Sequence, residues 1–373
     1  MENIYLDYAA TSLKHFDIYA SVTKKLEKIY ANPSSNHQMG KTANKFFKEA
    51  RRKIADFIKA EEKEIIFTSG ATEANNMVFN HIREKFNSGE IIISQIEHPS
   101  VIECANKLEH LGFKIIKIPT LSNGLVDIKL LENLINDKTR LISIMLANNE
   151  TGIINPIKKI TSLAKKHNIL VHSDIVQAFA KIQIDVKELG VDFASVSAHK
   201  IGATNNFGFL YAKNADIKPL LIGGGQENNL RSGTSDLFGA MVLADCIEKT
   251  WKNKEHLEEL KEYLLAELKT SQIAYELNSD TKLSLPNIIN IYFKNIQAQR
   301  LITYLDINNI FISGTSACSS GSLRASKVIT NIFDQARAEY SVRISIGFDT
   351  TKEKLDSLVY KIKNLEERIL KRG

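Results

Sequence analysis

The sequence contains few cysteines and no spacing typical of a metal site. Three cysteines, Cys104, Cys246 and Cys318, occur in 373 residues. So small and odd a number argues against a disulfide framework. No Cys-x-x-Cys or His-x-x-x-His spacing points to a bound metal. We therefore expect no metal site, and a protein that works in a reducing compartment.

Long apolar runs are also missing. The first residues, Met1 to Asp7, lack the apolar core of a signal peptide. No later run is long enough to span a bilayer. Together with the scarcity of cysteine, these absences predict a cytoplasmic protein with no membrane partner.

The net charge is +6, but the basic residues are interspersed with acidic ones. Pairs such as Lys158-Lys159 and Lys165-Lys166 fit the solvated face of a helix. Because no nucleic-acid-binding motif accompanies them, we expect no direct contact with nucleic acid. The length and the 43% apolar content suit a chain with a substantial core in two lobes.

Predicted strands and helices alternate from about residue 60 to residue 200. This alternation predicts an α/β fold with a largely parallel sheet and helices on both faces. The predicted strands cover residues 64–68, 90–94, 113–118, 140–146, 169–173 and 191–196.

The pattern changes near Trp251. A charged amphipathic helix with Leu257, Leu260, Leu264 and Leu268 leads into a mixture of strands and helices. Residues 288–293 and the alternating residues 341–348 are expected to be strands, and the chain ends in another amphipathic helix. We therefore predict a large domain over residues 14–250. A smaller α+β domain is predicted over residues 1–13 and 251–373.

Polar side chains follow five of the predicted strands, at the point where each strand ends. In a parallel sheet these ends share one edge, which is where ligands bind. Each residue alone has a plain structural explanation, such as a helix cap or a surface lysine. Five such residues at one edge indicate a ligand-binding site more strongly than any one of them. The five are Thr72, His98, Asn149, Asp174 and Lys200.

Two of these residues, Lys200 and Asp174, fit a pyridoxal phosphate (PLP) site. Such a site needs a lysine that forms a Schiff base and an acid against the pyridinium nitrogen. The turn Ser69-Gly70-Ala71-Thr72 opens a predicted helix. The free N–H groups and positive dipole end of that helix offer a cup for a phosphate.

Two residues of the C-terminal part can carry chemistry. Cys318 lies in a stretch of small polar residues, 313–322, where a thiol should be exposed and mobile. We interpret it as a reactive thiol. Arg343 lies on the polar side of its predicted strand, where a guanidinium can hold a substrate carboxylate through two hydrogen bonds. The strand alone supports a surface salt bridge equally well.

Taken together, these motifs resemble the cysteine desulfurases, a branch of the fold-type I, class V aminotransferase-like PLP enzymes. The resemblance extends over nearly the whole chain. It rests on residues 5–11, 68–73, Glu97-His98, 148–152, Asp174 with Gln177, 197–200, 231–234, 316–321 and Arg343.

The resemblance implies a mainly parallel seven-stranded sheet, PLP as cofactor and a homodimer with its site at the interface. It implies that Lys200 binds PLP and moves the Cα proton of the substrate, and that Asp174 pairs with the ring nitrogen. His98 would stack on the ring and act in acid–base steps. Gln177 and Asn149 would meet the phenolic oxygen of the ring or the substrate.

The resemblance also assigns the remaining site residues. Arg343, helped by Asn32, would hold the substrate carboxylate, and Cys318 would attack the substrate sulfur. The phosphate would be bound around Ala71 by Thr72, Ser197 and His199, with Thr234 reaching it from a second subunit.

The implied reaction converts L-cysteine to L-alanine and leaves a persulfide on Cys318. An acceptor protein would take the sulfur for iron–sulfur cluster assembly or tRNA thiolation. Another PLP enzyme of the same fold, such as a selenocysteine lyase or an aminotransferase, is the nearest rival, and Cys318 argues against an aminotransferase. A scaffold protein on a degenerate enzyme fold and an RNA-binding accessory are more distant rivals; Lys200, Asp174 and His98 argue against the scaffold.

Overall fold

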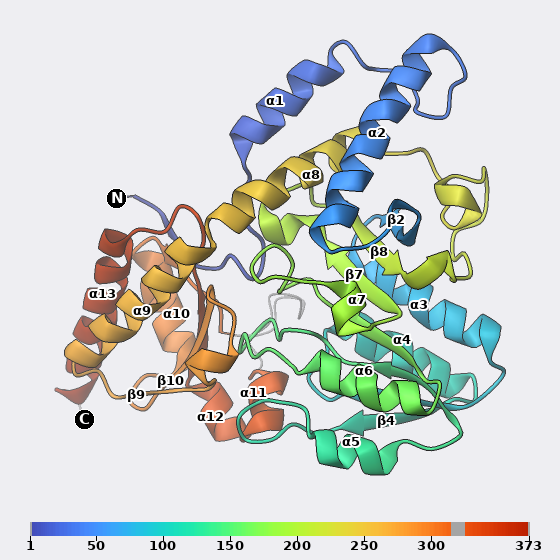
Figure 1. Ribbon diagram of the computed structural model, residues 1–373. Coiled ribbons are helices and arrows are strands. Elements are labelled where there is room, and N and C mark those ends of the chain that lie inside the picture. The colour runs from blue at the N-terminus through green and yellow to red at the C-terminus, as the bar shows by residue number, and fades with distance from the viewer. Residues whose placement is uncertain (1, 315–324, 372–373) are drawn as a thin grey trace.

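The computed structural model of the chain describes residues 2–314 and 325–371 (Figure 1). Cys318 therefore lies outside the described residues. At its centre is a seven-stranded sheet in which β8 runs antiparallel to both of its neighbours and the other pairs are parallel. In spatial order the strands are β2 (Ile65–Thr68), β8 (Gly208–Ala212), β7 (Phe193–Ser197), β6 (Leu170–Asp174), β5 (Thr139–Ser143), β3 (Glu90–Ser94) and β4 (Lys114–Ile118).

Apolar side chains cover both faces of this sheet, because successive residues of a strand point to opposite sides. In β3, Ile92 belongs to one buried cluster, whereas Ile91 and Ile93 belong to another. The first cluster includes residues of α2 (Gln38–Phe57), α6 (Ile157–Lys166) and α8 (Leu237–Lys252). The second includes residues of α3 (Ala71–Lys85) and α4 (Pro99–His110). The result is the predicted α/β fold, with three layers and a mainly parallel sheet.

The C-terminal part forms a separate apolar cluster. Its antiparallel sheet has the order β12 (Ser341–Ser345), β10 (Ile288–Phe293) and β9 (Tyr275–Leu277). The N-terminal β1 (Ile4–Tyr5) pairs in parallel with β11 (Ile310–Phe311) and carries Leu6 into the same cluster. The helices that contribute to it are α9 (Lys254–Thr270), α10 (Ala298–Ile307) and α13 (Lys352–Leu370).

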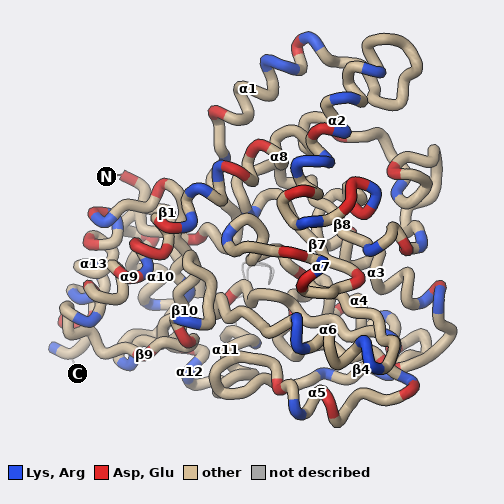
Figure 2. Tube along the Cα trace, viewed as in Figure 1, with Lys and Arg blue, Asp and Glu red and all other residues tan. Residues whose placement is uncertain are grey.

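The predicted division, with residues 14–250 in one domain and residues 1–13 and 251–373 in the other, stays a proposal. The clusters follow it only in part, because Ala9, Leu285 and Ile288 belong to the cluster of the main sheet. Short helices complete the fold: α1 (Phe16–Leu26), α5 (Ile128–Leu134), α7 (Val186–Leu189), α11 (Lys327–Ile332) and α12 (Gln335–Glu339). Figure 2 shows Lys and Arg intermixed with Asp and Glu along the chain. No helix among the described residues has the length and apolar character needed to cross a membrane.

Two strands end three residues earlier than predicted: β5 ends at Ser143 rather than at residue 146, and β12 also differs in burial. The alternating residues 341–348 predicted a strand with one polar side, but β12 ends at Ser345 and all of its residues are buried. The N-terminal segment accounts for this burial. Asp7 forms a β-bridge with Ser345, and the main-chain oxygen of Leu6 accepts a hydrogen bond from the Ser345 N–H. Contacts between the two ends of the chain therefore bury the polar side of this strand.

Candidate active site

Asp174 and Lys200 lie at the carboxyl ends of adjacent parallel strands. Asp174 is the last residue of β6 and pairs in register with Ser195 of β7. Lys200 follows β7 directly, in the short 3-10 turn Ala198–Ile201. The sequence predicted that both residues would lie at one sheet edge, and the topology confirms this.

Asp174 is held as a buried carboxyl group. It is 6% exposed, and its Oδ1 accepts the Val176 N–H at 3.0 Å. The Asn75 amide lies 3.4 Å from its Oδ2. Burial raises the pKa of Asp174, whereas the charges of His98 and Lys200 lower it. A carboxylate in this position is stabilised by a cationic N–H partner, which is what a protonated pyridine nitrogen offers.

His98 is connected to Asp174 through a short polar network. It is the N-cap residue of α4, and its Nδ1 lies 2.8 Å from Ser100 Oγ. That hydroxyl oxygen accepts a hydrogen bond from the Asn75 amide at 2.8 Å. Asn75 is fully buried, and the sequence analysis missed it. It lies one helical turn after Ala71, and this spacing from the glycine turn was the available signal.

The amine of Lys200 is held by the N-terminal segment. Its Nζ donates to the carbonyl oxygens of Ala9 and Ala10 at 2.8 and 2.7 Å. The neighbouring His199 lies with its Nδ1 3.1 Å from Thr11 Oγ1. Burial, followed by the charge of Lys200, lowers the pKa of His199 to about 3, so the imidazole is neutral at physiological pH.

Gln177 lies beside the same segment. Its amide nitrogen donates to the Ala9 carbonyl oxygen at 3.0 Å. Its Oε1 is buried and has no hydrogen-bond partner within residues 2–314 and 325–371. A buried carbonyl oxygen without a partner is costly. Oε1 therefore fits an additional donor, such as a hydroxyl group of a bound molecule.

The turn before α3 forms a cup next to the end of β7. Ser197 Oγ accepts the Ala71 N–H at 2.8 Å. A Cβ atom on Gly208 would lie 2.7 Å from the Gly70 Cα and 2.2 Å from the Val196 carbonyl oxygen, so only glycine permits this close approach. Thr72 is exposed in the first turn of the helix. Hydroxyl groups and N–H groups at a helix N-terminus suit a phosphate.

The loop that carries Thr234 reaches the rim of this cup. Arg231 donates to both carboxylate oxygens of Glu73 at 2.8 and 3.0 Å. Thr234 itself is exposed and lines a hollow together with Ser69 and Asn206. No hydrogen bond within the described part of the chain joins Thr234 to Ala71, Thr72 or Ser197.

Arg343 is buried rather than exposed, so the alternative of a surface salt bridge is wrong. Its side chain is 2% exposed, and its Nη2 donates to Asp7 Oδ1 at 2.6 Å. Its Nη1 donates to the carbonyl oxygen of Asn149 at 2.8 Å. Arg343 and Asn149 are thus brought together, and the N-terminal segment supplies a partner that the sequence analysis missed.

Asn32 is not brought to Arg343 within one chain. Its Oδ1 accepts the Ser34 N–H at 2.9 Å in the exposed connection between α1 and α2. That connection is at the top of Figure 1, far from β10 and its partner β12. The turn-forming residues around Asn32 explain this local structure.

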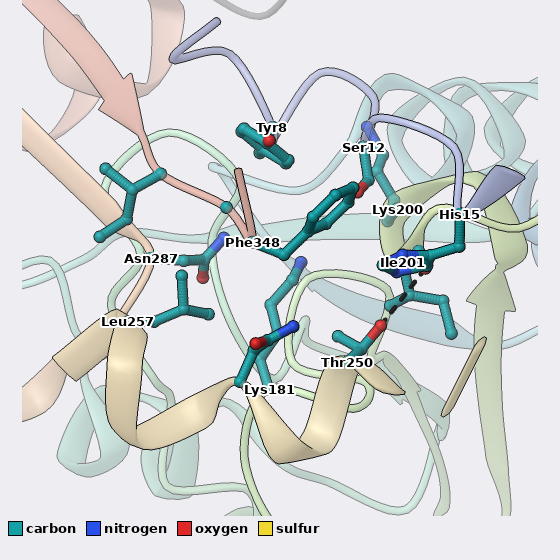
Figure 3. Close-up of a pocket in the computed structure, with 13 residues that line it drawn as sticks. Tyr8, Ser12, His15, Lys181, Lys200, Ile201, Thr250, Leu257, Asn287 and Phe348 are labelled. Atoms are coloured by element: carbon teal, nitrogen blue, oxygen red, sulfur yellow. Dashed lines mark hydrogen bonds between the residues drawn. The ribbon is translucent and has the colours of Figure 1, made fainter. Parts of the chain in front are cut away.

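A buried lysine that the sequence analysis missed lies behind Lys200. Lys181 lines a cavity of about 30 Å³ together with Lys200, His15 and Asn287 (Figure 3). It is 4% exposed, and its Nζ donates to the main-chain oxygen of Gln177 at 3.2 Å. Burial, together with the charges of Lys200 and Arg343, lowers the pKa of Lys181 to about 7. No local pattern marks a lysine in an irregular segment as buried.

Comparisons with known proteins show which family this chain resembles over nearly its whole length. Residues 4–358 match the family model described as aminotransferase class-V. The chain is 38% identical to the cysteine desulfurase IscS of Dictyoglomus turgidum (strain DSM 6724 / Z-1310), over 98% of this chain and 95% of the relative. A solved NifS-like protein superposes with a TM-score of 0.91 at 33% identity, covering 98% of this chain and 100% of that chain. The solved structure of SspA in complex with cysteine superposes with a TM-score of 0.82 at 32% identity, covering 92% of this chain and 99% of that chain.

Proposed function

The chain belongs to the cysteine desulfurases of the class V aminotransferase family, and on this premise we propose that it releases the sulfur of L-cysteine at the sheet edge formed by Asp174 and Lys200. The observation that carries the proposal is the placement of these two residues at the carboxyl ends of adjacent parallel strands. The cup at Ala71 and Ser197 lies at the end of the same strand β7. This is the arrangement of groups that PLP needs.

The residues of the site fit PLP. Lys200 would hold it covalently through its amine, and Asp174 would pair with its ring nitrogen. Gln177 Oε1 would accept from its phenolic hydroxyl group, where Asn149 would also meet the ring oxygen or the substrate. His98 would cover one face of the ring. The phosphate would lie at the cup formed by Ala71, Thr72, Ser197 and His199.

PLP, when bound, withdraws electrons from the Cα of the amino acid. Arg343 would bind the substrate carboxylate and so orient the Cα–H bond toward Lys200. The Lys200 amine would take the Cα proton and return it at a later stage, and His98 would move protons at the substrate face. These are general acid–base roles, which contribute through the position of each group.

We assign the sulfur acceptor to Cys318, whose sequence context carries the assignment. Its thiolate would attack the cysteine sulfur, so that an S–S bond forms and the C–S bond breaks. The electron pair remains on carbon, which takes a proton and becomes the methyl group of L-alanine.

The described residues on both sides of Cys318 support this role. Ser313 exchanges two main-chain hydrogen bonds with Arg343. Ser326 donates to Glu150, the neighbour of Asn149. Cys318 follows Ser313 by five positions in the sequence, and a stretch of that length spans at most roughly 17 Å. We therefore place the attachment points of the segment that carries Cys318 beside Arg343 and Glu150.

The persulfide would pass to an acceptor protein for iron–sulfur cluster assembly or tRNA thiolation, in the cytoplasm. We also propose a homodimer in which Thr234 of a second copy completes the phosphate cup. The exposure of Thr234 and of the nearby apolar Leu221 and Ile222, which are 42% and 88% exposed, supports an interface there.

The test is an absorption spectrum of the purified protein before and after L-cysteine is added, with assays for alanine and sulfide. A PLP band that changes with cysteine, together with alanine formation, is the expected result. A PLP band without alanine would instead favour another PLP reaction of the same fold. A protein that stays colourless with added PLP would favour a scaffold function.

A further inference from the structure

The Asp7 carboxylate forms an ion pair with the Arg343 guanidinium group, which the proposed function assigns to the substrate carboxylate. Its Oδ1 lies 2.6 Å from Arg343 Nη2, and the two side chains are 18% and 2% exposed. Asp7 carries the same chemical group as the α-carboxylate of an amino acid. Both groups would therefore bind one cation in a site largely shielded from solvent.

We propose that Asp7 is an internal competitor of the substrate carboxylate and sets the affinity of the site for amino acids. The inference rests on the proposed function, because it requires that Arg343 binds the substrate. The N-terminal segment, which carries Asp7, would then help to set the affinity for the substrate.

The donors of Arg343 leave room for a second carboxylate, but at an electrostatic cost. A guanidinium has five N–H groups. The Asn149 carbonyl oxygen and Asp7 Oδ1 each accept one, and Nε has no partner among the residues that the structure describes. A substrate carboxylate would bind the remaining donors close to the charge of Asp7. Two carboxylates on one cation repel each other, so each weakens the binding of the other.

The charge of Asp7 weakens substrate binding, but we expect the same charge to stabilise the folded chain. A buried guanidinium that loses its counter-ion destabilises the folded chain. Asp7 also has a fixed main chain, because its carbonyl oxygen accepts from the Ala10 N–H at 3.0 Å and from the Tyr5 hydroxyl at 3.1 Å. Asp7→Asn keeps this main chain and the side-chain shape while it removes the charge. It should therefore weaken the fold and strengthen substrate binding.

A role that only orients Arg343 predicts a different outcome. In that case the loss of the ion pair would leave Arg343 misplaced, and stability and substrate affinity would both fall. The sign of the change in affinity therefore separates the two roles.

The experiment uses the PLP-loaded enzyme. KM and kcat for L-cysteine, the Kd of L-alanine by titration of the PLP spectrum, and the Tm are measured for the wild type and Asp7→Asn. We expect KM and Kd to fall by about tenfold and the Tm to fall as well. A KM and Kd that rise or stay unchanged would overturn the proposal. If Asp7→Asn does not fold, Asp7→Ser removes the same charge and is read in the same way.

The matched control is Asp349→Asn. Asp349 pairs with Lys354 at 2.6 Å, and its N–H donates to the Tyr8 hydroxyl near the same segment. Its substitution should leave the Kd of L-alanine unchanged. An equal gain in affinity in this control would show a general charge effect and would contradict the role of Asp7.

Arg343→Gln separates this inference from the proposed function. If Arg343 binds the substrate carboxylate, the KM of Arg343→Gln for L-cysteine should rise by about 100-fold. Adding Asp7→Asn to this variant should then give no increase in substrate affinity. An unchanged KM in Arg343→Gln would reject Arg343 as the carboxylate partner. A raised KM in Arg343→Gln, with no gain in Asp7→Asn, would reject the competitor role alone.

Discussion

Lys181 donates a hydrogen bond to the main-chain oxygen of Gln177 at 3.2 Å, inside the part of the molecule that holds Lys200. The Gln177 side chain in turn donates to the Ala9 carbonyl oxygen, which also accepts from the Lys200 amine. One carbonyl oxygen of the N-terminal segment thus links the predicted site lysine to the buried lysine behind it. The charge of Lys200 adds to burial in lowering the pKa of Lys181.

Lys181→Met should change how stability depends on pH. The pKa of Lys181 is about 7 in the folded chain, below the ordinary lysine value of 10.5. Between these values the unfolded chain binds more protons, so this lysine makes the free energy of unfolding rise with pH. Lys181→Met should remove that rise, which amounts to up to a few kcal/mol.

Urea denaturation at several pH values between 7 and 10 measures this difference in the free energy of unfolding. Lys28→Met, at an exposed position, is the control and should run parallel to the wild type. If the curve of Lys181→Met also runs parallel to the wild type, Lys181 is not a depressed, buried amine.

Asp174→Asn should lower kcat for L-cysteine by at least about 100-fold, because an amide cannot stabilise a protonated ring nitrogen as a carboxylate does. PLP should still be bound covalently, since Lys200 is intact. Steady-state alanine formation and the absorption spectrum measure the two effects. Asp216→Asn is the control, because that exposed aspartate pairs with Lys85 at 3.1 Å on the surface. A wild-type kcat in Asp174→Asn would contradict the assignment.

Cys318→Ser should abolish persulfide formation and alanine turnover while the PLP spectrum is retained. Burial raises the pKa of Cys104 to about 11 and that of Cys246 to about 12. Both thiols are therefore protonated and unreactive at pH 8. Limited alkylation at this pH, followed by mass spectrometry, should label Cys318 first. Full activity in Cys318→Ser, or preferential labelling of Cys104, would count against the role of Cys318.

Gly208→Ala should weaken both the fold and the binding of PLP. The added Cβ would lie 2.2 Å from the Val196 carbonyl oxygen and 2.7 Å from the Gly70 Cα, and backbone atoms on both sides must then move. We expect a loss of at least about 2 kcal/mol in the free energy of unfolding. We also expect a weaker Kd for PLP, because Gly70 precedes the cup. Gly223→Ala meets only the Ser232 side chain, at 3.2 Å, and should change both quantities little.

Local patterns in the sequence predicted much of the fold. Strand β10 covers the predicted residues 288–293, and the predicted leucines of α9 are buried. The strands at whose carboxyl ends His98, Asp174 and Lys200 lie also begin and end within two residues of the predicted ranges. Apolar periodicity is set by neighbouring residues, so the sequence displays it directly.

The sequence by itself determined that the main sheet is largely parallel and that Asp174 and Lys200 lie at the same edge of it. Alternating strands and helices leave few topologies, and the carboxyl ends of parallel strands meet at one edge. Only the tertiary structure decided the partners of these groups: Asp7 for Arg343, the Ala9 and Ala10 carbonyl oxygens for Lys200, and Gln177 for the unexpected Lys181. Asp7 and Arg343 are separated by 336 positions. Hydrogen bonds over such separations depend on how the two ends of the chain pack, which no local period records.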